Sequence, residues 1–186
     1  MDLCPSSKPG YEKAFIDQLT DQNGKTPIAI AVSSAWIIHH EAAFEALRNN
    51  PHLDITWVNH THTHFYDPHL EDRHNFMLAP HTDVQNEILG VEKTLLEKGI
   101  TPSVFFRFPG LIADSTLMKA LKETYFLIPI GADTWIAKHQ GLHDNGFILI
   151  HGNKNEPLGI EMLEKMLPEV THRYTLRPLR EAFLED

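Results

Sequence analysis

Three histidines on alternate residues, His60, His62 and His64, directly follow an apolar run over residues 55–58. His60 and His64 are four residues apart, so their side chains can converge on one side of a helical turn or of an extended segment. Neutral imidazoles placed in this way suit a borderline divalent metal such as zinc. His62 is open to two interpretations, as a group that supports the site or faces a substrate, or as a solvent-exposed side chain. The segment predicts a metal site held by His60 and His64.

The metalloprotease pattern H-E-x-x-H is a different use of two histidines four residues apart. That mechanism needs a glutamate beside the first histidine, where it acts as general base. Thr61 occupies this place in the chain. The sequence therefore disfavours the metalloprotease mechanism.

Further polar residues follow other predicted strands at their carboxyl ends. Arg107 follows a strand over 103–106, Asp133 and Trp135 follow one over 126–130, and His151 follows one over 147–150. In parallel α/β folds these ends share one face of the sheet or barrel, and active sites are built there. The alternative is that these residues are solvated loop side chains. The repeated placement favours one common site.

The elements that must position these residues alternate along the chain. Apolar runs predict strands over 28–32, 55–58, 103–106, 126–130, 147–150 and 174–176. Helical spacing predicts helices around 11–19 and over 40–48, 84–95, 115–123 and 158–167. This order favours an α/β fold with a parallel sheet or barrel covered by helices. We expect residues 1–186 to form a single domain.

Composition excludes several classes of partner. The formal net charge of −9 leaves no basic patch for a phosphate backbone, so nucleic acid is not an expected partner. The single cysteine, Cys4, excludes an internal disulfide framework. No apolar run approaches the roughly 18 residues of a membrane span, and the first residues do not form a signal peptide. We expect a cytoplasmic chain as written, or a cell-envelope or secreted one if the protein begins upstream of Met1.

Four motifs together resemble a known family. The sequence 59–64, NHTHTH, resembles the N-H-T-x-x-H metal motif of the NodB-type polysaccharide deacetylases, carbohydrate esterase family 4. Residues 107–110, 133–135 and 148–151 resemble its R-x-P-[YG], Asp/Trp and L-x-H motifs in the same order, and 174–179 looks like its final strand. The resemblance covers almost the whole chain. It implies an irregular (β/α) barrel.

The resemblance implies metal-dependent hydrolysis of N-acetyl groups on an amino-sugar oligomer or polymer, with zinc or cobalt as the metal. Asp2 would be the catalytic base, Arg107 would pair with it, and His151 would protonate the departing amine. Asp133 would hydrogen-bond to His151. The expected substrate-binding residues are Trp36, Pro109, Trp135 and Leu149.

The first motif departs from the family pattern. Leu3 stands where the family has a metal-binding aspartate, and a leucine cannot coordinate a metal. The strand that precedes this motif in the family is also absent, so either the protein begins upstream of Met1 or the barrel has an open edge. Substitute ligands could come from His69, His74 or His81, whose alternative is a solvated loop.

Two rival functions follow from this departure. One is a catalytically silent carbohydrate-binding homologue that kept the fold and part of the site. The other is a related hydrolase that acts on a different C–N bond or on an ester.

Overall fold

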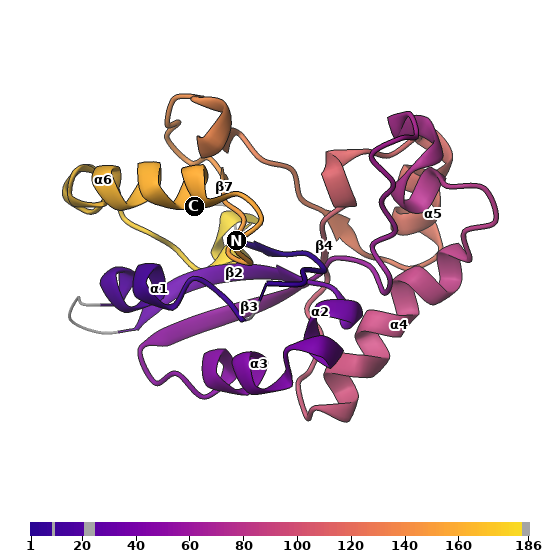
Figure 1. The fold of residues 1–186 in the computed structure, drawn as a ribbon, viewed down its shortest axis with the longest axis horizontal. Coiled ribbons are helices and arrows are strands. Elements are labelled where there is room, and N and C mark those ends of the chain that lie inside the picture. The colour runs from indigo at the N-terminus through magenta and orange to yellow at the C-terminus, as the bar shows by residue number, and fades with distance from the viewer. Residues whose placement is uncertain (9, 21–24, 184–186) are drawn as a thin grey trace. The chain divides into compact units, whose positions relative to one another are not determined.

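The structure, a computed structural model, describes residues 1–8, 10–20 and 25–183 and has an α/β fold (Figure 1). Its strands are β1 (Asp2–Leu3), β2 (Thr26–Val32), β3 (Leu53–Asn59), β4 (Phe105–Phe106), β5 (Ile128–Pro129), β6 (Thr134–Trp135) and β7 (Ile148–Leu149). Its α-helices are α1 (Lys13–Leu19), α2 (Ser34–His39), α3 (Glu41–Arg48), α4 (Val84–Glu97), α5 (Ser115–Glu123) and α6 (Pro157–Arg173). Short 3-10 helices include η2 (Phe76–Leu78), η3 (Pro109–Leu111) and η4 (Ile136–Lys138).

The sheet order within the described residues is β1-β2-β3-β4-β5, with β6 and β7 forming a separate pair. β3 runs parallel to β4, with Asn59 opposite Phe106, and β4 runs parallel to β5. β6 and β7 are also parallel, with Trp135 opposite Leu149. The predicted α/β class with a parallel sheet is confirmed.

The chain divides into two compact units. Unit 1 comprises Met1–Ile30, His40–Thr56 and Ala132–Asp186, and unit 2 comprises Ala31–His39 and Trp57–Gly131.

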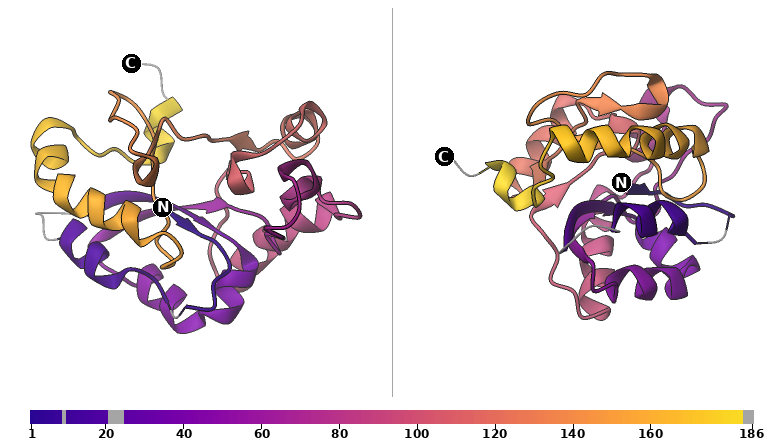
Figure 2. Two further views of the ribbon diagram at one scale, coloured as in Figure 1. Left: turned by 45° about the horizontal axis from the view of Figure 1, so that its top comes forward. Right: turned by 90° about the vertical axis from the view of Figure 1, so that its left-hand side faces the viewer.

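Unit 1 is built around α1 and α6, which pack against each other. Phe15 and Ile16 of α1 are buried, and so are Ile160, Leu163 and Leu167 of α6, because their spacing places them on one side of each helix. α6 is the long orange-to-yellow helix of Figure 2. The packing of α6 against α1 holds α6 in place, and the N-terminal end of α6 carries a residue of the candidate site.

The first residues of the chain also belong to unit 1. The Asp2 backbone N–H donates to the Ile150 carbonyl, and the Gly152 N–H donates to the Asp2 carbonyl. These bonds form a parallel bridge between Asp2 and His151. The backbone of the expected base therefore lies beside that of the expected acid.

Unit 2 has its own apolar core, which is made of Met77, Ile88, Phe106, Phe108, Leu117 and Leu121. Helix α4 contributes through an apolar stripe and is capped at its start by Asp83, whose carboxylate accepts from the Asn86 N–H at 2.9 Å. It ends before Gly99, whose φ of +73° is a left-handed conformation that a residue without Cβ adopts at little cost.

Three details differ from the sequence expectation. Residues 174–176 are irregular rather than a strand, because α6 extends to Arg173 and Tyr174 caps it. Helix α2 and strand β6 lie in segments for which no helix or strand was expected. None of the helices in the described part of the chain is long and apolar enough to cross a membrane.

Candidate metal centre and active site

His60 lies directly after β3 in unit 2 and is 1% exposed. Its Nδ1 lies 2.8 Å from the backbone carbonyl oxygen of Arg107. Because a carbonyl oxygen only accepts hydrogen bonds, Nδ1 carries the proton and Nε2 keeps the lone pair that a metal requires. Metal-binding histidines are commonly fixed by such a bond through their other ring nitrogen.

His64 lies beside His60 in the same unit. The ring centroids are 4.8 Å apart with an interplanar angle of 64°, and one ring nitrogen of each residue lies within 4.8 Å of the other. His64 has a φ of +52°, and its ring and that of Phe76 form a T-shaped pair with centroids 5.4 Å apart. The two imidazoles therefore fit a pair of protein ligands for one divalent ion.

The histidine loop is attached to the N-terminal part of α4. The Asn59 side chain donates to the Ile88 carbonyl at 2.9 Å and accepts from the Thr61 N–H at 3.1 Å. The Thr63 N–H and hydroxyl both donate to the carboxylate of Glu87. These bonds fix the backbone on both sides of His62 and so set the separation of the two expected ligands.

His62 packs on α4 rather than beside the other two histidines. A Cβ built on Gly90 would lie 2.7 Å from Cγ of His62, so the imidazole rests on the bare backbone of that residue. The His62 N–H donates to the Glu87 carbonyl. The third histidine thus has a structural role in the attachment of the loop to the helix.

Glu92 of α4 also contacts the start of the histidine loop, because its carboxylate accepts from Asn59 Nδ2 at 2.8 Å. Burial raises the pKa of its carboxyl above the ordinary value of 4.5, and the Asn59 hydrogen bond offsets only part of that effect. A raised folded-state pKa means that the folded protein binds the proton more tightly than the unfolded chain does. Stability from this group is therefore complete below about pH 4.5 and is lost as the pH rises through the raised pKa.

Glu92→Gln is expected to remove this pH dependence, because glutamine keeps an acceptor for Asn59 and carries no charge. The free energy of unfolding of the variant should increase relative to the wild type between pH 4 and about pH 7. Urea unfolding at several pH values measures the difference. Glu97→Gln, at an exposed position of the same helix, is the matched control. A difference that stays constant with pH would contradict this account.

Arg107 is buried immediately after β4 in unit 2. Its Nη2 donates to the Gly131 carbonyl at 2.9 Å, and its backbone N–H donates to the Asn59 carbonyl at 2.9 Å. Because the backbone carbonyl of Arg107 also accepts a hydrogen bond from His60, Arg107 fixes one expected metal ligand through its backbone. The sequence motif was interpreted only through the guanidinium.

Pro109 and Gly110 begin the 3-10 helix η3, and Pro109 is buried. Gly110 has a φ of +63°, and a Cβ there would lie 2.6 Å from Cε2 of Phe76. A glycine is thus required where the backbone approaches the ring that contacts His64. This close approach explains why the R-x-P-G motif of this chain has a glycine at its last position.

His151 of unit 1 follows β7 and is paired with a carboxylate. Its Nδ1 lies 2.9 Å from Oε2 of Glu156, and the indole Nε1–H of Trp135 donates to the same oxygen at 2.9 Å. The Trp135 and His151 rings lie 5.6 Å apart between centroids. Lys138 Nζ lies 3.4 Å from the centroid of the Trp135 ring, so one face of the indole is covered by a cation.

The predicted bond between Asp133 and His151 is wrong. One carboxylate oxygen of Asp133 accepts from the Phe147 N–H at 2.8 Å. The register of β6 with β7 explains this, because Thr134 pairs with Ile148 and Asp133 therefore lies beside the start of β7. His151 comes after the other end of that strand. Glu156, which the motifs did not indicate, is the carboxylate beside the histidine.

The remaining candidates are mostly core residues. Trp36 is 0% exposed within α2, so the expectation that it stacks on a sugar is corrected. Leu149 and Leu3 are also buried, as is Cys4. His69, His74 and His81 are exposed, as expected for a solvated loop.

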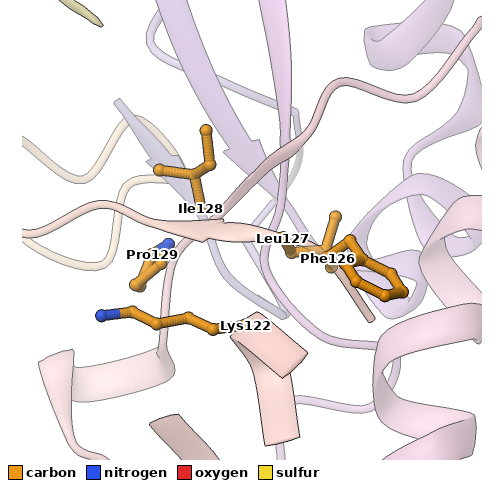
Figure 3. Close-up of a pocket in the computed structure, with 5 residues that line it drawn as sticks. All are labelled: Lys122, Phe126, Leu127, Ile128 and Pro129. Carbon is orange, nitrogen blue, oxygen red and sulfur yellow. The ribbon is translucent and has the colours of Figure 1, made fainter. Parts of the chain in front are cut away.

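A surface hollow of about 340 Å³ lies elsewhere in unit 2 (Figure 3). It is lined by Lys122, Phe126, Leu127, Ile128 and Pro129, from the end of α5 through β5. These residues carry no metal ligand and belong to none of the four motifs. The hollow is therefore separate in chemistry from the candidate site.

No family model matches the sequence. A family 4 carbohydrate esterase from Bacillus anthracis has a similar structure, with a TM-score of 0.69 at 16% identity over 97% of this chain and 79% of that one. A peptidoglycan deacetylase from Bacillus subtilis has a TM-score of 0.68 at 13% identity over 97% and 87% of the two chains.

A pseudoenzyme of the same esterase family is also similar, with a TM-score of 0.63 at 11% identity over 97% of this chain and 65% of that one. Active and inactive proteins thus share this architecture, so the fold does not decide activity. These likenesses agree with the fold that the resemblance implied. The chain has the NodB-type fold of the family 4 carbohydrate esterases.

Proposed function

We propose that this protein is a metal-dependent hydrolase that removes N-acetyl groups from amino-sugar glycans. The observation that carries the proposal is the pair His60 and His64, with His60 fixed through Nδ1 so that Nε2 keeps its lone pair. The ordered motifs and the fold support it, since one protein of similar structure is a peptidoglycan deacetylase.

His60 and His64 would hold the metal, with zinc or cobalt as the expected ion. Such an ion, when bound, polarises the acetyl carbonyl and lowers the pKa of a water.

The other roles belong to side chains of the chain itself. Asp2 would accept the proton of the attacking water as general base, and Arg107 would orient Asp2. His151 would donate a proton to the nitrogen of the leaving amino sugar, which departs more readily as an amine than as an anion. Asp133 would keep the backbone before β7 in place through Phe147.

The substrate-facing residues are proposed on the same basis. Trp135 and Leu149 are opposite each other in β6 and β7, where they would wall the slot for the acetyl methyl group. Pro109 would contribute to substrate binding next to Arg107. The acetylated glycan itself would be an oligomer or a polymer.

A catalytically silent carbohydrate-binding homologue is the second candidate. Leu3 favours it, because a fully buried leucine at the position of a metal-binding aspartate removes an anionic ligand. The similar pseudoenzyme shows that the fold exists without the activity.

An assay on acetylated chitooligosaccharides, small acetamides and aryl acetates tests the proposal. The expected result is release of acetate from the oligosaccharides, its loss on chelation, and its recovery with zinc or cobalt. Turnover of aryl acetates without any oligosaccharide would replace the proposal by an esterase. Binding of the oligosaccharide without turnover at saturating metal would establish the silent homologue instead.

A further inference from the structure

We propose that Glu156 is the positioning residue that fixes His151 in its Nδ1–H tautomer and that Trp135 holds Glu156 in place. Glu156 lies outside all four motifs. The inference deepens the proposed function, on which it rests for the role of His151 as acid. The tautomer of the His151 ring can be measured whether or not the protein is active.

Two donors converge on one oxygen of Glu156. The indole N–H of Trp135 is always a donor, so Oε2 accepts from it at 2.9 Å. The same oxygen lies 2.9 Å from Nδ1 of His151. An ionised carboxylate only accepts, so the imidazole must carry its proton on Nδ1.

The carboxylate is held at the start of a long helix. Glu156 occupies the position just before α6, and Pro157 is the first helical residue, where its fixed φ suits the helix and its missing N–H costs nothing. The Gly159 N–H donates to the Glu156 carbonyl. Because α6 packs on η4, which directly follows Trp135, the helix and the indole are parts of one packed structure.

This arrangement decides which nitrogen exchanges the catalytic proton. With Nδ1–H committed to Glu156, the imidazolium gives up the proton on Nε2 to the leaving amine and remains as the neutral Nδ1–H ring. Without the carboxylate, the imidazolium could instead lose its Nδ1 proton, and the neutral ring that remains would face the leaving amine with an Nε2–H that is too weak an acid to protonate it. Loss of the carboxylate should therefore lower kcat rather than raise KM.

The test is ¹⁵N spectroscopy of the His151 ring in the zinc-loaded protein at a pH where the ring is neutral. The wild type should show a protonated Nδ1 and an unprotonated Nε2. Glu156→Ala should convert His151 to a mixture of tautomers and lower kcat by about 100-fold or more. Glu156→Gln, whose oxygen can still accept, should restore part of the Nδ1–H form. Trp135→Phe should lower the fraction of the Nδ1–H tautomer, because the indole N–H that holds Glu156 in place is gone.

Glu161→Gln, one turn along the same helix at an exposed position, is the matched control and should change neither spectrum nor kcat. A wild-type ring protonated on Nε2, or a spectrum that Glu156→Ala leaves unchanged, would overturn the inference. A correct tautomer in a protein without deacetylase activity would sustain the His151–Glu156 pairing and count against the proposed function alone.

Discussion

His64→Ala is expected to lower zinc affinity by more than about 100-fold and to remove acetate release in parallel. Losing a residue that merely supports a metal ligand costs about 10- to 100-fold, and His64 is proposed to be a ligand itself. Its ring lies 4.8 Å from that of His60, so its removal leaves one imidazole of the pair. Zinc per chain after dialysis, and competition with a chromophoric chelator, measure the effect.

His60→Gln is the second variant, because a polar replacement keeps the buried position next to the Arg107 carbonyl occupied. It should lose zinc as His64→Ala does. His69→Ala removes an exposed histidine of the following segment and is the matched control, with unchanged zinc content. Circular dichroism verifies that each variant is folded. Stoichiometric zinc in both folded ligand variants would exclude the site.

Local sequence patterns were sufficient to predict helices that contribute few residues to the candidate site. The bounds of α5, Ser115–Glu123, were predicted from its sequence pattern, and the structure adds the Asp114 cap at its start. β6 was not predicted, because two residues show no periodicity and because its stability comes from pairing with β7 across an intervening segment that no local pattern assigns. Trp36 was misplaced because it follows the predicted strand over 28–32 at its carboxyl end, where site residues were expected, whereas α2 buries the indole.

The candidate site also has one part that the sequence predicts and one part that it does not. His60 and His64 are close in sequence, so their proximity could be expected from spacing, and the structure brings their rings together. The contact of His151 with Glu156 depends on where α6 begins, which no motif specifies. A signal was present in Glu156-Pro157, since proline marks the first helical position and places the preceding carboxylate at a helix start five residues after His151.

His151→Ala is expected to lower kcat/KM for acetylated amino sugars by about 10²- to 10⁴-fold, with zinc content unchanged. An amine leaves a tetrahedral intermediate only after its nitrogen is protonated, and His151 is the proposed donor. Its ring is partly exposed, with 18% of the side chain accessible, so it is fixed by Glu156 and still reachable. His143→Ala, an exposed histidine of the same unit, is the control and should keep full activity.

The nature of the leaving group separates an acid from a structural residue. A nitrophenolate departs as a stable anion and needs no proton, so His151→Ala should hydrolyse a nitrophenyl acetate nearly as fast as the wild type does. A structural defect would slow both substrates by the same factor. The ratio of the two losses is therefore the quantity to measure, and an equal loss on amide and aryl ester would show that His151 does not act as the acid. A large loss on the amide alone would locate the proton transfer at this imidazole.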